Sequence, residues 1–508
     1  MNKKIIINNI ILLIISLIGF VFMLNILPAK GAVYSHDSVA YSYAAKSLIN
    51  GDGIKYFGYK TPVIQWPPVY ILILIIPIIF SIKISQFALV LNSLIFMVLI
   101  FISGKWMLSN LINKWLAYIG ILFIFFSIPI IHISKHIWTE PLFILLVMVS
   151  IISFQKYKNT LSMKWLIISG LLSASCWLTR YTGIVVLITC CIIILVRIKP
   201  IKKKIKHLFT YGIIAALPML LWVLRNFIIS RTITGGRTSK ITPIVNNINK
   251  SLHIFYSWFI DKNYKKMLIG IIILVVIIMT SIILICIRKK QKKFIAYLQK
   301  GCTEYFLFAI LYYTVIIISE SRYAIDPINN RLLSPVFIPI LFVVLLIIDA
   351  LINQFEKNKK ILYIINPGII LALLLIVNYP VRYHINNMKK FHNVEEGIAY
   401  SNYIIDNETL KYIEHGTYTK DTILFSNNPT ILTYHTDIDS RWMPKKEGIK
   451  LYDIDSFNNS IKQIKEVYIV WFGDKNSTFL YTINDISKIY QLKLIKKLTD
   501  GYIYKIIK

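Results

Sequence analysis

Long apolar stretches recur through residues 1 to 380 and are separated by short polar or basic segments. A helix needs roughly 20 apolar residues to cross a membrane, and backbone inside the hydrocarbon core must satisfy its own hydrogen bonds. The pattern therefore predicts a bundle of membrane-spanning helices. The run from Ile5 to Leu27 is too long for a signal-peptide core, which indicates an uncleaved first helix.

The composition is that of a membrane protein, although the chain is strongly basic. Hydrophobic residues make up 56% of the chain and the mean hydropathy is +0.63, while 57 Lys and Arg against 24 Asp and Glu give a net charge of +33. In so apolar a chain the basic surplus belongs to a membrane protein, and nucleic acid is not an expected partner. The cysteines lie in or beside apolar spans without a C-x-x-C motif, so we predict neither a disulfide framework nor a cysteine metal site.

We predict an α-helical polytopic membrane protein with about eleven spans. The spans are expected at 5 to 28, 84 to 103, 115 to 132, 140 to 154, 165 to 179, 181 to 197, 208 to 225, 267 to 287, 303 to 319, 332 to 352 and 361 to 379.

Residues 67 to 82 are apolar enough to be a further span, but the loop charges argue against it. With the N-terminus in the cytoplasm, the expected spans place the basic loops at 197 to 207, 288 to 293 and 357 to 360 inside as well. A further span at 67 to 82 would move all of them outside, against the positive-inside rule. We therefore expect 67 to 82 to be a re-entrant or juxtamembrane helix that begins at Pro67-Pro68.

The same topology predicts two domains, a membrane domain over 1 to 380 and an extracytoplasmic α/β domain over 381 to 508. Residues 421 to 426 and 467 to 472 have the apolar pattern of buried strands, and 491 to 507 contains two strand-like runs. From this topology we also expect the loop 29 to 83, and the other loops of the membrane domain that carry unusual polar residues, to face outward.

Asp37 is the first candidate for chemistry, because acids are scarce and this one follows the first span. Ser35-His36-Asp37 precedes a helix expected from Ser38 to Asn50, so Asp37 is either a catalytic base or merely part of the helix cap. His36 has no second His or Cys at ligand spacing, so a metal site is not predicted there.

Glu140 is the second candidate, since a carboxylate at the start of a membrane span is expensive unless it is paired or functional. Thr139 and Glu140 before Pro141 would also make a good helix N-terminus, which is the structural alternative.

Arginines form the third group, at the outer ends of spans, whereas lysines dominate the inner loops. The planar guanidinium suits phosphate, and contact with lipid head groups is the alternative for each of them. They are Arg180, Arg225, Arg237, Arg322 and Arg331.

These motifs, in this order, resemble the GT-C glycosyltransferases, and most closely glycosyltransferase family 39 with its protein O-mannosyltransferase and aminoarabinose-transferase branches. The stretch Asp37-Ser38-Val39-Ala40-Tyr41 resembles the family's Asp-Glu-x-x-Tyr, with Ser38 in place of the Glu, and Trp66-Pro67-Pro68-Val69-Tyr70 resembles its Pro-Pro-Leu segment. The Thr-Glu-Pro at Glu140, the Leu-Thr-Arg-Tyr-Thr-Gly around Arg180 and the stretch from Asp326 to Pro335 resemble later landmarks.

The resemblance implies transfer of a sugar from a polyprenyl-phosphate donor, with inversion, to a lipid, polysaccharide or protein of the cell envelope. Asp37 would be the general base, and Glu140 would orient the acceptor or support Asp37. The arginines would hold phosphate, with Tyr41, Trp66 and Tyr181 as further substrate-binding residues. The sequence establishes no cofactor. A divalent cation is an open option, for which Asp37 and Glu140 alone are too few ligands.

Two other classes remain open: a flippase or assembly component for polyprenyl-linked glycans, and a surface-polysaccharide polymerase or ligase. A transporter should place ionisable residues at mid-depth in its spans, whereas the polar residues here gather at the outer ends.

Overall fold

The computed structural model describes most of the chain, as two compact units. The described residues are 3–58, 60–237, 239, 241–260, 297, 301–323, 326–354, 359–392, 407–416, 422–436, 438, 440–446, 453–464, 466–473 and 479–507. The first unit comprises 1–29, 89–223 and 240–392, and the second comprises 30–88, 224–239 and 393–508.

The first unit is helical throughout its described residues. Eight helices among the described residues are long and apolar enough to cross a membrane. The helices of this unit, some of which extend past its boundaries, are α1 (Lys3–Ile26), α5 (Ile84–Asn110), α6 (Lys114–Phe125), α7 (Ile128–Ser134), α8 (Glu140–Thr160), α9 (Met163–Thr179), α10 (Ile184–Arg197), α11 (Ile201–Ser230), α12 (Ile244–Ser257), α14 (Thr303–Arg322), α15 (Asn330–Leu333), α16 (Phe337–Gln354) and α17 (Lys359–His392), with short 3-10 turns at Tyr181–Gly183 and Ser334–Val336.

Helices lie at each predicted span within the described residues. Several are longer than expected, whereas those at 165 to 179 and 181 to 197 are shorter apolar helices. The predicted span at 208 to 225 is a helix of 30 residues, and the one at 361 to 379 continues to His392. The predicted span at 267 to 287 lies outside the described residues. The apolar helical segment Val69–Ile79 is short of a span, because eleven residues rise only about 16 Å in a hydrocarbon core of about 30 Å.

The chain leaves helical structure between α7 and α8. Ser127 ends the α6 segment and caps α7 by accepting a hydrogen bond from the Ile130 N–H, with a proline in the first turn of α7. A short segment then connects α7 to α8, which begins at Glu140 with Pro141 in its first turn. Asn92 of α5 fixes this segment by donating to the carbonyls of Ser134 and His136.

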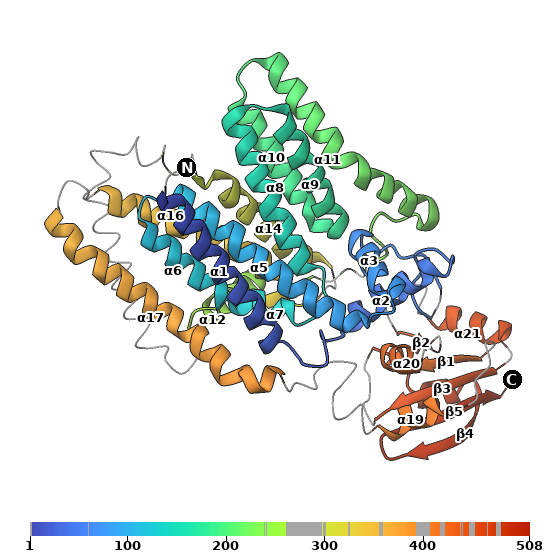
Figure 1. The fold of residues 1–508 in the computed structure, drawn as a ribbon. Helices are drawn as coiled ribbons and strands as arrows, with labels where there is room; N and C mark the ends of the chain where they lie inside the picture. The colour runs from blue at the N-terminus through green and yellow to red at the C-terminus, as the bar shows by residue number, and fades with distance from the viewer. Residues whose placement is uncertain are drawn as a thin grey trace. The chain divides into compact units, whose positions relative to one another are not determined.

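The core of the first unit is a continuous apolar cluster shared by α1, α5, α6, α8, α14 and α16. Figure 1 shows α8, α9 and α10 side by side. A second apolar cluster, centred on Tyr157, Leu166 and Tyr211, fills the space among the helices α8 to α11. Asp349 of α16 ties down the α5–α6 turn, because it accepts from the N–H groups of Ile112 and Asn113 at 2.7 and 2.9 Å.

The sequence analysis did not predict α12, which lies in the loop expected between 225 and 266. Its fully buried residues are polar: Asn247 donates to Ser321 Oγ at 2.9 Å, and Ser251 hydrogen-bonds Tyr313 at 2.6 Å. Phe255 also packs on Tyr313 of α14, with ring centroids 5.9 Å apart. The apolar residues of this segment recur at helical spacing, so a search for apolar periodicity could have found the helix.

The second unit combines the loop that follows α1 with the C-terminal α/β fold. Its helices are α2 (His36–Ile49), α3 (Val69–Ile73), α4 (Ile75–Ile79), α19 (Glu408–Glu414), α20 (Pro429–Thr436), α21 (Ile454–Gln463) and α22 (Ile483–Ser487), and its strands are β1 (Thr422–Ser426), β2 (Ser440–Trp442), β3 (Glu466–Phe472), β4 (Gln491–Leu498) and β5 (Gly501–Ile507).

The strands form one mixed sheet in the order β2-β1-β3-β5-β4, seen in red and orange in Figure 1. β1 pairs in parallel with β2 and β3, whereas β5 is antiparallel to both β3 and β4. The strands predicted at 421 to 426 and 467 to 472 are therefore confirmed, as are the two runs within 491 to 507. The core beneath the sheet includes Phe425, Phe457 and Ile469.

The loop that follows the first span packs against this α/β fold within the second unit. His36 Nδ1 lies 2.6 Å from Thr430 Oγ1 of α20, and Arg441 Nε donates to the Gly58 carbonyl at 3.0 Å. Gly58 has a φ of +79°, and a Cβ there would lie 2.4 Å from the Ser440 carbonyl oxygen, so only glycine fits. Such long-range pairings cannot be anticipated from local sequence patterns.

Candidate active site

Asp37 lies in the first turn of α2 but is not its cap. The N-cap is Ser35, whose hydroxyl accepts from the Ser38 N–H at 3.3 Å, while the Ser38 hydroxyl accepts from the Ser35 N–H at 3.0 Å. Two serines thus form a complete capping box, in which the third helical residue is ordinarily Glu or Gln. The capping role that was the structural alternative for Asp37 is filled by its neighbours.

Aromatic rings surround the same helix in the second unit. Tyr41, one turn after Asp37, is buried and meets Trp66 edge to face at 5.2 Å between centroids and Tyr70 at 5.5 Å. Tyr56 stacks on Trp66 at 6.0 Å. The structure therefore brings together the two predicted aromatic residues Tyr41 and Trp66 in one partly exposed aromatic cluster.

Two of the predicted arginines belong to the second unit. Arg225 Nη1 donates to the Val63 carbonyl at 2.7 Å and to Asn226 Oδ1 at 2.9 Å, so this guanidinium holds the loop that carries Trp66. Arg237 is exposed and follows Gly235, which has a φ of +85°.

Glu140 lies between two arginines in the first unit. Its side chain is fully buried; Arg331 Nε donates to Oε1 at 2.6 Å, and Arg180 Nη1 donates to the same oxygen. Arg180 Nη1 also donates to Thr139 Oγ1 at 2.8 Å. The residues come from the start of α8, the end of α9 and the short helix α15, so three segments distant in sequence converge on one carboxylate.

An aromatic stack borders this cluster. The Arg331 guanidinium lies 4.4 Å from the Trp138 ring centroid, and His136 stacks on Trp138 with centroids 3.8 Å apart and an interplanar angle of 7°. Asp326 reaches Arg331 Nη1 at 3.6 Å but is 62% exposed, so solvent screens this contact. The sequence analysis assigned no role to Trp138.

The electrostatic balance of the cluster is positive. Two guanidinium groups surround one carboxylate, which leaves about one net positive charge before the solvent-exposed Asp326 is counted. The imidazole of His136 responds to these surroundings: burial, the neighbouring His132, and the charges of Lys135 and Arg331 lower its pKa to about 3, so it is neutral at pH 7.

The first unit also contains the predicted residues Tyr181, which directly follows Arg180, and Arg322. Tyr181 is half-buried, and its hydroxyl accepts from Trp222 Nε1 at 3.3 Å. Arg322 is exposed in the last turn of α14. Sequence analysis missed Glu320, two residues earlier, whose carboxylate is 1% exposed and has no hydrogen-bond partner among the described residues. The cost of an acid at a span end, which singled out Glu140, could have found it.

Within the described residues, no three His, Cys, Asp or Glu side chains gather where they could hold a metal ion. A divalent cation prefers several carboxylate or carbonyl oxygens. Glu140 already carries two guanidinium groups, so it does not fit as a ligand of a divalent cation, and we derive no step through one.

No protein-family model matches this chain, and no curated protein matches it either. Among solved structures, ArnT from Cupriavidus metallidurans bound to undecaprenyl phosphate is similar over 98% of this chain and 97% of that chain, with a TM-score of 0.60 and 10% identity. The apo state of the same protein gives the same values. The S. cerevisiae Pmt1-Pmt2 protein O-mannosyltransferase complex bound to the sugar donor covers 44% of this chain and 34% of that chain at a TM-score of 0.34 and 15% identity, too low to support an inference.

At 10% identity the likeness to ArnT shows a shared fold. The expected fold class is confirmed: the chain is a multi-pass helical membrane protein that shares the fold of ArnT and has a small C-terminal sheet domain.

Proposed function

We propose that this chain is an integral-membrane glycosyltransferase that moves a sugar from a polyprenyl-phosphate carrier to a cell-envelope acceptor at the outer face of the membrane. The observation that carries the proposal is the fold shared with ArnT over nearly the whole of both chains, because an ArnT structure holds undecaprenyl phosphate. The positions of Asp37 and of the Glu140 cluster within this fold add chemical support.

Asp37 is proposed as the general base. A phosphate leaving group departs without protonation, so inversion at the sugar carbon needs a base for the acceptor hydroxyl and cations for the phosphate, but no general acid. Asp37 suits the first task because it is a partly exposed carboxylate in the first turn of α2. Removal of one general base typically slows a reaction 10²- to 10⁴-fold.

Arg180 and Arg331 are proposed to stabilise the phosphate. Each guanidinium presents several N–H donors in one plane, and Glu140 holds both of them through a single buried oxygen. The network is left with about one positive charge, which suits one phosphate group. These ion pairs favour a role for Glu140 in orienting the arginines over a direct contact with the acceptor.

The other predicted residues take supporting parts in the proposal. Tyr41 and Trp66 offer aromatic faces of the kind that pack against sugar rings, and Arg225 supports the backbone beside Trp66. Exposed Arg237 and Arg322 are proposed to contact the carrier or lipid head groups. The N-terminus is proposed to be cytoplasmic and the C-terminal domain extracytoplasmic, as the loop charges predict.

The test uses purified full-length protein in lipid vesicles, radiolabelled polyprenyl-phosphate sugars and an envelope extract as the acceptor source. Asp37→Asn should lower transfer about 10²- to 10⁴-fold while the protein inserts and folds normally. Asp52→Asn is the matched control, because Asp52 is an exposed acid of the same loop. Transfer by Asp37→Asn at the rate of the control would exclude Asp37 as the base, and absence of transfer by the unmodified protein from every carrier would oppose the function itself.

A further inference from the structure

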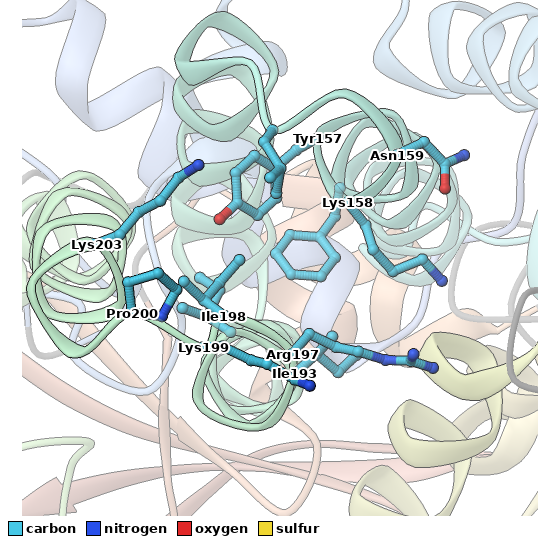
Figure 2. A pocket seen from close by; sticks show the side chains of 12 residues that line it. Tyr157, Lys158, Asn159, Ile193, Arg197, Ile198, Lys199, Pro200 and Lys203 are labelled. Atoms are coloured by element: carbon cyan, nitrogen blue, oxygen red, sulfur yellow. The ribbon is translucent and has the colours of Figure 1, made fainter.

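A cavity lies near the C-terminal end of α8, at the opposite end of this helix from Glu140, between α8, α10 and the start of α11. Its volume is about 530 Å³, within the range of 300 to 1,000 Å³ that is usual for small-molecule sites. Figure 2 shows Lys158, Arg197, Lys199 and Lys203 around its opening.

The floor of the cavity is apolar and rigid. Phe154, Ile193 and Ile194 line it and are all buried, and Tyr157 is held in place by a hydrogen bond between its hydroxyl and His207 Nδ1. This floor belongs to the packed cluster between α8 and α11, so the cavity is part of the folded bundle.

The rim of the cavity is cationic. Arg197, Lys199 and Lys203 are exposed side chains, and the described part of the chain supplies no carboxylate to pair with any of them. Lys158 differs, because its Nζ lies 2.5 Å from Oε1 of the buried Glu304. Three cations without a counter-charge therefore lie at the rim, above an apolar floor. This arrangement suits a ligand that has both an anionic group and an apolar group.

We infer that this cavity binds the phosphate of an anionic membrane lipid, with the glycerol and the first part of the acyl chains on the apolar floor. A soluble anion would use the rim but gain nothing from Phe154, Ile193 and Ile194, whereas a phospholipid uses both. Basic pockets between membrane helices suit anionic head groups, and each basic residue near such a surface strengthens binding by roughly fivefold. The positive-inside expectation puts the cavity on the cytoplasmic side, where anionic lipids face it.

The inference is tested with the delipidated full-length protein in a nonionic detergent, titrated with dioleoylphosphatidylglycerol and followed by native mass spectrometry. The cavity variant is Arg197→Gln, Lys199→Gln and Lys203→Gln combined. The control variant is Lys164→Gln, Lys202→Gln and Lys206→Gln combined, which removes the same charge from exposed positions of neighbouring segments that do not line the cavity. Dioleoylphosphatidylcholine and inorganic phosphate are the comparison ligands.

The cavity variant should lose at least tenfold in affinity for phosphatidylglycerol, because three contributions of roughly fivefold are removed, and the control variant should stay within about twofold. Equal losses in the two variants would mean diffuse surface attraction and would overturn the site. Displacement of the lipid by millimolar inorganic phosphate would overturn the lipid source, and equal binding of phosphatidylcholine would overturn the preference for an anionic head group. The measurement needs no transfer activity, so its outcome is independent of the proposed function.

Discussion

The ion pairs of Glu140 allow one substitution to be worked through quantitatively. Glu140→Gln keeps the shape of the side chain but removes its charge. The carboxylate is fully buried, and the side chains of its partners Arg180 and Arg331 are 15% and 10% exposed. Both arginines donate to the same carboxylate oxygen, so the amide oxygen of Gln can still accept from them, but it carries no charge to offset the two buried guanidinium groups.

The expected cost follows from this burial. Removing one partner of a buried ion pair costs about 3 to 5 kcal/mol, because the remaining charge is desolvated and unpaired. The retained amide acceptor brings the expected loss of unfolding free energy for Glu140→Gln to about 3 kcal/mol. If the proposed phosphate role is right, donor affinity should also weaken, since the two guanidinium groups would no longer be held together.

The assay is thermal and denaturant unfolding of the purified protein in detergent, together with donor titration of the transfer reaction. Glu466→Gln is the control, because Lys505 Nζ lies 2.6 Å from Glu466 Oε1, the same separation as Arg331 Nε from Glu140 Oε1, but its side chains are 36% and 40% exposed. Exposed pairs contribute little. Similar destabilisation by the two substitutions would refute the reasoning, since burial would then not decide the energy.

Two further predictions concern the surroundings of the proposed active site. Thr430→Val removes the hydroxyl that hydrogen-bonds His36 and should lower the unfolding free energy by about 1 kcal/mol. It should also slow transfer, because His36 directly precedes Asp37. An unchanged transfer rate would show that α20 does not position α2. His136 has a folded-state pKa of about 3, below the 6.5 of an exposed imidazole, so its stability contribution is complete above about pH 6.5 and is lost as the pH falls. The melting temperature should therefore drop between pH 7.5 and 5.5 by the equivalent of about 1 kcal/mol, and His136→Asn should flatten that slope; an equal slope in the variant would exclude His136 as its source.

Several elements were predictable because their signals are local. The apolar stretches become helices wherever the structure describes them, since a run of about 20 apolar residues has few other stable states. The helix at His36–Ile49 follows from a cap before it and a glycine after it, and the strands β1 and β3 follow from short apolar runs of the kind that sheets bury.

The contacts that define the proposed active site were not predictable, because they join residues far apart in the sequence. Glu140 was a notable acid and Arg331 a notable base, but the pair is separated by 191 positions, and nothing local specifies that their side chains meet. The same holds for His36 and Thr430, which are 394 positions apart. Charge scarcity identified the candidates, while only the fold could assign their partners.

Ser38 stands beside Asp37, the proposed base, where the motif that this stretch resembles has a Glu. The missing Glu of the Asp-Glu pair falls at the third position of α2, where a capping box ordinarily places Glu or Gln. Ser38 occupies that position and completes the box with Ser35 through neutral hydroxyl groups. The helix start is therefore capped without a second negative charge beside Asp37. A reaction with a phosphate leaving group needs one general base and no general acid. A single carboxylate in this turn, with no adjacent acid to compete for cations or protons, would meet that need.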